Sequence, residues 1–369
     1  MKHLHIIAFD IPLPANYGGA IDVFYRLKAL HEQGVAITLH CFDYARPHND
    51  ELNNYCEKVH YYKRDTSLRA QFHLRPYTVV SRQNTDLLRN LLNDEHPILF
   101  EGLMCCGFLD DVRLKSRIKL VRPHNVEHAY YFGLAKATKN IIKKAYYAIE
   151  ALKLAKYESV LCHADAILAL STKEQAHFQL KFPKKSVYFF PCFHQHETLN
   201  LPTGRGQYIL YHGNLQLSEN EQAVRYLCRY VFSKLNFPCV VAGLNPKPSL
   251  QKFIQKYPNV KLVASPTKQA MDKLIREAQI NILITHQNTG LKLKLLHALF
   301  AGRFVIANSD MLTGSGLETL CHKADSAEAQ IACCKELFNK TFDENDLRQA
   351  VLVPNYINSE QAQRLICLF

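Results

Sequence analysis

A dense group of polar side chains follows an apolar segment in the first half of the chain. Residues 118–121 have the pattern of a buried strand, and the six residues Arg122-Pro123-His124-Asn125-Val126-Glu127 come directly after it. An imidazole, an amide and a carboxylate this close together can hold a proton or orient a polar ligand. We therefore predict that His124 is catalytic and that Asn125 and Glu127 bind a ligand. The alternative is a plain helix start with Asn125 as its N-cap.

A pair of glycines suggests a second ligand-binding loop near the N-terminus. Gly18 and Gly19 lie between a predicted strand at 4–9 and a helix predicted to begin near Ala20. Glycine lets the backbone approach a ligand closely, and the N–H groups at a helix start favour an anion such as phosphate. Neither G-x-G-x-x-G nor the P-loop pattern is present, so an ordinary glycine turn stays open as the alternative.

The loop after the predicted strand 208–211 has a third glycine, within His212-Gly213-Asn214. Gly213 again permits close approach of the backbone, so we assign Gly213 and Asn214 to ligand binding, with a structural turn as the alternative. Ser218 and Glu221 have the spacing of a capping box and predict that Ser218 caps the helix that follows.

The segment from Gly290 to Gly302 combines a glycine start, a basic first turn and an apolar helix. Lysines in the first turn of a helix oppose the helix macrodipole, so Lys292 and Lys294 favour an anion nearby. We predict that Gly290, Lys292 and Lys294 contact a bound anion. A solvated basic helix face is the alternative.

The elements that position these residues follow from the hydrophobic pattern. Short aliphatic segments alternate with longer helical ones, which is the signal for parallel sheets built from βαβ units. Ligands bind outside the carboxyl ends of strands in such sheets, where the four loops above begin. The predicted fold is α/β, with two Rossmann-like doubly wound domains facing a cleft. The predicted strands are 4–9, 35–42, 98–100, 118–121, 166–170, 187–190, 208–211, 239–242, 260–263, 282–284 and 304–307.

A polar, turn-prone segment at 201–206 separates the two sets of strands. We predict an N-terminal domain at 1–200 and a C-terminal domain at 201–354, each close to the usual domain size. Residues 355–369 are predicted to form a helix that crosses back to the N-terminal domain.

Composition narrows the function classes. The net charge of +12 is spread over both halves and favours a phosphorylated ligand or an anionic membrane surface over nucleic acid, for which no motif is present. The 12 cysteines form no C-x-x-C pair, so we expect buried reduced thiols rather than disulfides or a metal site. No apolar segment is long enough to span a bilayer, and Asp10 interrupts the N-terminus too early for a signal peptide. The prediction is a cytoplasmic protein.

Taken in order, these motifs resemble those of retaining glycosyltransferases of the GT-B fold, in the family 4-like group that assembles bacterial cell-surface glycans. The resemblance covers nearly the whole chain. Asn16-Tyr17-Gly18-Gly19-Ala20 resembles the family's N-terminal glycine loop, and Ser171, after the pair Ala164-Asp165, is similar to its strand-ending serine. The most specific match is the segment from Gly290 to Gly302, which resembles the sugar-donor site, with His297 where a glutamate is usual.

The resemblance implies an acceptor-side N-terminal domain and a C-terminal domain for the nucleotide-sugar donor. It implies transfer of a hexose, with retention of anomeric configuration, to a glycan or lipid-linked acceptor in surface polysaccharide biosynthesis. His124 would position the sugar, while Lys292, Lys294 and the amides of Gly18 and Gly19 would stabilise the leaving diphosphate. The chain has no Asp-x-Asp motif, so we expect no metal and no cofactor.

A basic amphipathic region at 136–156 points to a membrane. Its lysines alternate with isoleucine, leucine and tyrosine, a composition that suits peripheral contact with an anionic lipid surface, where a lipid-linked acceptor would be found. A solvated face on a core-packed helix is the alternative. The first interpretation places the protein at the inner face of the cytoplasmic membrane.

A second function hypothesis comes from the family's glutamates. Neither of the two glutamates usual in the sugar-donor segment is present, since His297 stands at one of these positions. A catalytically silent GT-B protein that binds a sugar nucleotide or a partner transferase therefore remains the alternative to an active enzyme.

Overall fold

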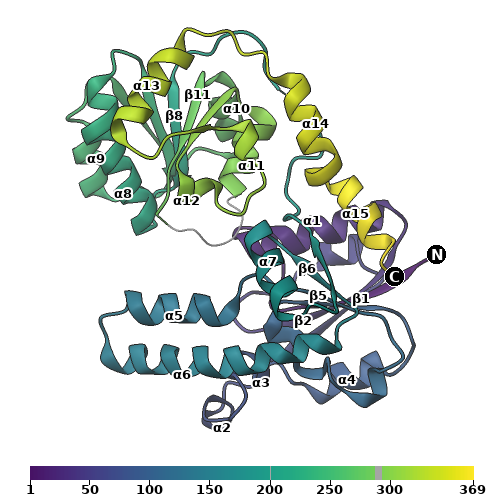
Figure 1. Cartoon of the computed structure of the whole chain (residues 1–369). Coiled ribbons are helices and arrows are strands. Elements are labelled where there is room, and N and C mark those ends of the chain that lie inside the picture. Colours follow the sequence, from purple (N-terminus) through teal and green to yellow (C-terminus); the bar gives the residue numbers. More distant parts are fainter. Residues whose placement is uncertain (200, 287–292) are drawn as a thin grey trace. The chain divides into compact units, whose positions relative to one another are not determined.

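The computed structural model describes residues 1–199, 201–286 and 293–369. The chain divides into two compact units (Figure 1). Unit 1 contains Met1–Gln195 together with Asn355–Phe369, and unit 2 contains His196–Pro354. The last segment of the chain thus belongs to the same unit as the first.

Unit 1 is built on a seven-stranded sheet in the order β3-β2-β1-β4-β5-β6-β7. All neighbouring strands pair in parallel. The strands are β1 (His3–Ala8), β2 (Ala36–Asp43), β3 (Lys58–Lys63), β4 (Ile98–Glu101), β5 (Lys119–Arg122), β6 (Ala166–Ala169) and β7 (Ser186–Phe189). The order reverses at β1, and this switch point is where doubly wound sheets place their ligands.

The helices of unit 1 include a long antiparallel pair. Helices α5 and α6 pack along each other and project from the sheet of this unit (Figure 1). The helices are α1 (Gly18–Glu32), α2 (Leu68–Gln71), α3 (Tyr77–Val80), α4 (Thr85–Leu91), α5 (Glu127–Ala137), α6 (Ile141–Tyr157), α7 (Thr172–Lys181) and α15 (Asn358–Ile366).

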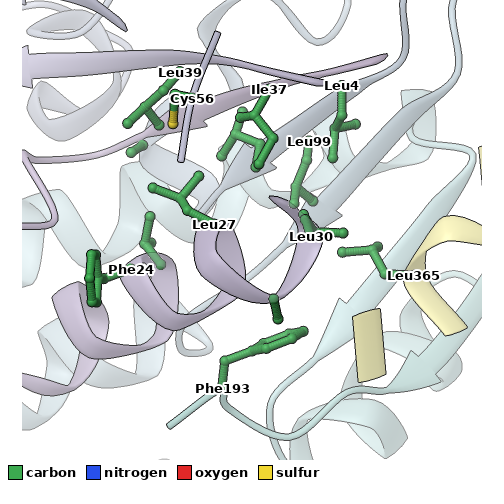
Figure 2. Close-up of a cluster of buried hydrophobic side chains, with 14 of the residues drawn as sticks. Leu4, Phe24, Leu27, Leu30, Ile37, Leu39, Cys56, Leu99, Phe193 and Leu365 are labelled. Carbon is green, nitrogen blue, oxygen red and sulfur yellow. The ribbon is translucent and has the colours of Figure 1, made fainter. Parts of the chain in front are cut away.

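Helix α1 is fixed against the sheet by its apolar face. Leu27 and Leu30 are fully buried, and their spacing places them on one side of the helix. Figure 2 shows this face packed beneath side chains of β1, β2 and β4, with Leu365 of α15 in the same cluster. Each fully buried leucine contributes about 1.5–3 kcal/mol, so the cluster holds the polar residues of α1 at a defined place beside the sheet.

Unit 2 has a six-stranded parallel sheet in the order β10-β9-β8-β11-β12-β13. Its strands are β8 (Ile209–Asn214), β9 (Cys239–Leu244), β10 (Val260–Ala264), β11 (Ile280–Leu283), β12 (Phe304–Ala307) and β13 (His322–Lys323). Its helices are α8 (Ser218–Tyr226), α9 (Pro248–Ile254), α10 (Lys268–Glu277), α11 (Leu293–Ala301), α12 (Ser309–Leu312) and α13 (Ala327–Phe338), and α14 (Asn345–Tyr356) leads toward α15.

The predicted strands are present, with ends that differ by at most three residues, and the structure adds β3 and β13. Within the tail predicted as a helix at 355–369, α14 ends at Tyr356 and α15 runs from Asn358 to Ile366. The predicted cap at Ser218 is wrong. Ser218 is the first residue of α8, and the N-cap, Leu217, offers no side-chain hydrogen bond. Glu221 instead pairs with Arg225 and Lys247.

All 12 cysteines fall within the described residues, and each is a free thiol. Most of them are buried, as the sequence predicts, whereas Cys162 and Cys367 are exposed. Among the described residues, the helices are too short or too polar for any of them to cross a bilayer.

Candidate active site

A buried network of charged groups lies at the carboxyl edge of the sheet in unit 1. Arg122 ends β5, and its guanidinium donates to both carboxylate oxygens of Asp22 on α1, at 2.8 and 2.9 Å. Arg26, one turn along α1, pairs with Asp22 at 3.2 Å and with Glu101 at the end of β4. The network therefore ties two strand ends to one helix.

Charge is balanced within this network. Burial raises the pKa of Asp22, but Arg122 and Arg26 outweigh burial and hold that pKa well below its usual range. Arg122 also donates to the carbonyl oxygens of Phe190 and Pro191, both at 3.0 Å. Two arginines thus face two carboxylates, which is the arrangement that makes buried charges tolerable.

His124 is held at the rim of the network. Its Nε2 lies 2.9 Å from Oε2 of Glu101, and its ring meets the ring of Phe9 edge to face at 5.0 Å. The side chain of His124 is 10% exposed, whereas that of Glu101 is fully buried. The carboxylate fixes the imidazole, and His124 is the most exposed side chain of this network.

Asp22, Glu101 and His124 bring three ligand atoms within 4.8 Å of one another, so we tested them as a metal site. Both oxygens of Asp22 already accept hydrogen bonds, from Arg122 and from the backbone N–H of Phe193. The oxygens of Glu101 contact Arg26 and His124. A cation here would meet two buried guanidinium groups, so these residues fit an ion-pair network and not a metal centre.

The glycine loop lies beside His124. Helix α1 begins at Gly18, and the N-cap Tyr17 offers no side-chain hydrogen bond to the first turn. A Cβ on Gly19 would lie 2.6 Å from Cζ of Phe9, so part of the need for glycine is close packing against the ring that contacts His124. Arg46, which sequence reasoning missed, braces the loop through Oδ1 of Asn16 at 3.0 Å and the ring of Tyr17.

Glu127 is buried and is the first residue of α5. Asn125 does not cap α5, because the N-cap is Val126 without a side-chain bond, so the helix-cap alternative for Asn125 is wrong. Burial first, and Glu174 next, raise the pKa of Glu127 to about 7. Burial raises the pKa of Glu174 to about 7 as well. The neighbouring carboxyl groups therefore favour their protonated forms.

Ser171 has a structural role. Its hydroxyl accepts a hydrogen bond from the backbone N–H of Glu174 at 3.1 Å and caps α7. Ser171 and Glu174 have the spacing of a capping box, which accounts for the serine at the end of β6.

In unit 2, β8 and β9 approach each other closely at their carboxyl ends. A Cβ on Gly243 would lie 1.8 Å from the carbonyl oxygen of Gly213, so Gly243 has to be glycine. Gly213 has more room, since its Cβ would meet Asn220 at 3.3 Å. Burial, followed by the charges of His297 and Lys294, holds the pKa of His212 well below its usual value. His212 is therefore neutral here.

Lys294 lies in the first turn of α11, at the same edge of the sheet. Its ammonium donates to Oδ1 of Asn220 at 3.1 Å and lies 5.2 Å from the centre of the Tyr211 ring. Asn220 also accepts from the hydroxyl of Tyr211 at 2.9 Å and donates to the carbonyl oxygen of Asn214 at 3.0 Å. These contacts join the predicted residues Asn214 and Lys294 through Asn220, which sequence reasoning missed.

His297, one turn further along α11, faces other side chains. Its Nε2 lies 2.8 Å from Oδ1 of Asp272 on α10, and its ring centre lies 4.4 Å from that of His196. Burial lowers the pKa of His297, although Asp272 opposes this effect. A hollow of about 410 Å³ opens beside these groups; its lining residues are His196, Thr198, Asp272, Lys273, Arg276, Phe300 and Ala301.

The structure groups the predicted site residues into two sets. Gly18, Gly19, His124, Asn125 and Glu127 follow strand ends in unit 1. Gly213, Asn214, Lys294 and His297 belong to unit 2. Gly290 and Lys292 lie outside the described residues.

Sequence reasoning missed Asp22, Arg26 and Glu101. Glu101 directly follows the predicted strand 98–100, so the rule that singled out His124 would also have found it. Asp22 and Arg26 are four residues apart and so lie on one helix face, but an i, i+4 pair of opposite charges is most often a surface pair.

Comparison with known sequences finds a family match and a relative that covers most of the chain. Residues 206–339 match the family described as glycosyl transferases group 1. A 44.6 kDa protein in the cps region of Klebsiella pneumoniae is 26% identical over 343 residues, which cover 86% of this chain and 85% of that protein.

Solved structures share the fold along the full length. The apo structure of OtsA matches with a TM-score of 0.61 at 11% identity, over 100% of this chain and 99% of that one. TarM matches with a TM-score of 0.61 at 10% identity, over 100% of this chain and 98% of that one. A trehalose-6-phosphate synthase matches with a TM-score of 0.63 at 12% identity, over 99% of this chain and 98% of that one. The predicted resemblance to GT-B glycosyltransferases and the predicted pair of Rossmann-like α/β domains are confirmed.

Proposed function

We propose that this chain, a GT-B protein whose residues 206–339 match glycosyl transferases group 1, transfers a hexose from a nucleotide-diphosphate sugar to a glycan or lipid-linked acceptor. The family match carries the proposal, because it covers the sheet that holds Gly213, Asn214 and Lys294 at its carboxyl edge. The relative in a cps, or capsule, region supports surface polysaccharide biosynthesis as the process.

The proposed reaction retains the anomeric configuration. The bond between the anomeric carbon and the phosphate oxygen breaks, a bond to the acceptor oxygen forms on the same face, and the acceptor proton passes to the leaving phosphate. Glycosyl transfer with retention is the subject of the work on the similar trehalose-6-phosphate synthase, which supports this choice. The acceptor is the nucleophile, and His124 positions the sugar.

Negative charge develops on the diphosphate as the bond breaks, so fixed cations and N–H groups must face it. We assign the ammonium of Lys294 to the diphosphate. Lys292, Gly290 and the backbone at Gly213 and Asn214 are assigned to the same group. In unit 1, the amides of Gly18 and Gly19 are assigned to anion binding, whereas Asn125 and Glu127 are assigned to the sugar. We assign His297 to the nucleoside, where its neighbours His196 and Asp272 orient it.

The proposed enzyme is independent of metal. Lys294 supplies positive charge in unit 2, and the clustered carboxylates Asp22 and Glu101 of unit 1 are already paired with arginines. Chelation of divalent ions is therefore expected to leave nucleotide binding and turnover unchanged.

The thermal unfolding midpoint, measured with UDP, GDP, ADP and CDP, tests the nucleotide site. A ligand that binds the folded state raises the midpoint by mass action. We expect a rise with one nucleoside diphosphate, the same with magnesium and with EDTA, and a smaller rise for Lys294→Ala. Lys335→Ala, an exposed lysine on α13, is the matched control and keeps the full rise. An equal rise in Lys294→Ala and Lys335→Ala would remove Lys294 from the site.

The pairing of His297 with Asp272 favours a second candidate function. A side chain already engaged within unit 2 suits a catalytically silent protein that binds a sugar nucleotide or a partner transferase. The two functions differ in one observable. A silent protein gives the rise in unfolding midpoint but releases no nucleoside diphosphate from any sugar nucleotide, with or without acceptor.

A further inference from the structure

Helix α6 presents an apolar face to solvent. Ile141 and Ile142 are each 82% exposed, Leu152 is 63% exposed and Ile149 is 53% exposed. Ile141, Ile149 and Leu152 are spaced by eight and three residues, so they lie on one side of the helix. The opposite side, with Ala151 and Leu154, is the buried one. Large aliphatic side chains gathered on an exposed face mark an interaction surface.

A second exposed apolar segment adjoins this helix. Phe72 is 83% exposed and Leu74 is 92% exposed, just after α2. The backbone N–H of Tyr77 donates to Glu150 of α6 at 2.8 Å, which ties this segment to the helix. A hollow of about 400 Å³ joins the two, and its lining includes Leu74, Arg75, Lys153 and Lys156. We call this the α2–α6 surface; it comprises Leu68, Phe72, Leu74, Arg75, Lys136, Lys139, Ile141, Ile142, Lys143, Lys144, Ile149, Leu152, Lys153 and Lys156.

The charge on the α2–α6 surface has one sign along α5 and α6. Residues 128–149 contain four lysines and no aspartate or glutamate. The acids at either end, Glu127 and Glu150, are buried, and Glu150 pairs with Lys153 at 2.7 Å. Beside the hollow, Arg75 faces Asp110 at 3.9 Å. The lysines at 136, 139, 143 and 144 are exposed and are not neutralised by acids of their own helices.

We propose that the α2–α6 surface docks unit 1 on an anionic lipid bilayer, with the lysines at the headgroups and the aliphatic side chains between them. Cationic and aliphatic side chains exposed together around the first turns of α6 are what such an interface requires. The hollow beside Lys153 and Lys156 suits a headgroup phosphate. A nucleic acid would match the lysines but not the isoleucines, since single strands are held by aromatic stacking and duplexes by phosphate contacts.

Vesicle cosedimentation of the full chain tests the proposal. The probes are vesicles of phosphatidylcholine alone and of phosphatidylcholine mixed with phosphatidylglycerol. We expect binding to the mixed vesicles that weakens with salt, and little binding to the neutral ones. Ile141→Asn with Ile142→Asn, and separately Lys143→Gln with Lys144→Gln, should each weaken binding about tenfold or more.

Two matched pairs control for general changes in surface polarity and charge. Leu180→Asn with Leu92→Asn alters exposed leucines elsewhere on unit 1, and Lys173→Gln with Lys184→Gln alters exposed lysines in and just after α7. Both pairs should bind like the unaltered chain. Ile149→Asn with Leu152→Asn repeats the apolar test at a second position, so that a folding defect in one variant does not decide the outcome.

Several results would overturn the proposal. These are the absence of binding to mixed vesicles, equal binding to neutral vesicles, and equal loss in the control pairs. If the α6 variants lost binding to a short oligonucleotide but kept binding to the mixed vesicles, the surface would be assigned to nucleic acid instead. The nucleotide-dependent unfolding midpoint, measured in the same variants, reports on the proposed transferase separately and should not change.

Discussion

Glu101 joins His124 to Arg26. One carboxylate oxygen of Glu101 lies 2.9 Å from Nε2 of His124, and the other contacts the guanidinium of Arg26 on α1. The orientation of the imidazole at the end of β5 thus depends on a helix far away in the chain. This dependence separates the role of Glu101, which positions, from that of His124, which contacts the sugar in the proposed reaction.

Glu101→Gln should therefore harm folding as well as turnover. Loss of one partner from a buried ion pair costs about 3–5 kcal/mol, because the remaining charge is left without compensation. Arg26 keeps Asp22, so we expect the lower end of that range. His124→Ala should cost far less stability but reduce turnover as strongly. Urea unfolding and donor turnover, measured on both variants, check this; equal stabilities for the two would contradict the network described.

Gly19→Ala and Gly133→Ala should move stability in opposite directions. A Cβ at Gly19 would lie 2.6 Å from the Phe9 ring, whereas one at Gly133, inside α5, meets nothing within 4 Å. Alanine is favoured over glycine in a helix by about 0.5–1 kcal/mol, so Gly133→Ala should stabilise by that amount. Gly19→Ala should destabilise by about 1 kcal/mol or more and lower turnover, because Phe9 packs against His124. The two unfolding free energies, measured side by side, decide whether Gly19 is constrained.

Stability should fall as the pH rises through neutrality. The pKa of Glu127 is about 7 in the folded state against an ordinary value of 4.5, so the folded protein holds a proton that the unfolded chain has lost. The resulting stability is present below about pH 4.5 and is lost as the pH rises through 7. At pH 8 the free energy of unfolding of Glu127→Gln should exceed that of the unaltered chain by on the order of 1–3 kcal/mol. Near pH 4.5 the two free energies should be equal.

Unfolding midpoints at the two pH values measure this difference. Glu360→Gln, at an exposed carboxyl on α15, is the control and should leave the pH profile unchanged. A constant difference between Glu127→Gln and the unaltered chain at both pH values would show that Glu127 does not titrate near 7.

A chain of buried histidines should limit stability in acid. His5 and His40 on neighbouring strands lie 2.8 Å apart, and His40 lies 2.8 Å from the hydroxyl of Tyr62. Burial lowers the pKa of His5 to about 4, despite Asp94, and holds that of His40 well below 6.5. These groups are neutral when folded, so the stability present above pH 6.5 is lost as the pH falls toward 4.

His40→Gln should make this decline shallower, because one of the two buried titrating rings is gone. His163→Gln, at an exposed histidine after α6, should reproduce the decline of the unaltered chain. The unfolding midpoint between pH 7 and pH 4 provides the comparison. If the unfolding midpoint of His40→Gln fell as steeply with pH as that of the unaltered chain, the loss of stability in acid would have another origin.

The sequence pattern predicted the sheets because their strands are buried on both faces and so are continuous aliphatic segments. It missed β3 because this strand lacks such a continuous aliphatic segment. Lys58–Lys63 is an edge strand in which lysine, histidine and tyrosine outnumber the single valine, and only its pairing with β2 makes it a strand. The Ser218 cap was mispredicted because the chain enters α8 one residue earlier than the capping pattern implies, with Leu217 as the N-cap.

The loops of the candidate site could be predicted, but their supporting contacts could not. His124 and Gly19 follow strand ends in the sequence itself. The partners of Asp22 and Glu101 are separated from them by 100 and 75 residues, and only the folded sheet brings them together. Lys294 was assigned from the helix dipole alone, while the bond to Asn220 that fixes its ammonium spans 74 residues.

Release of nucleoside diphosphate from a panel of nucleotide sugars, in EDTA, tests the central claim most directly. The account predicts release from one sugar nucleotide by the unaltered chain, at least about tenfold slower release by His124→Ala, and unchanged release by the control Lys335→Ala. Nucleotide binding without release from any of the sugar nucleotides, in the presence of acceptor extract, would contradict a transferase and favour the silent sugar-nucleotide-binding protein.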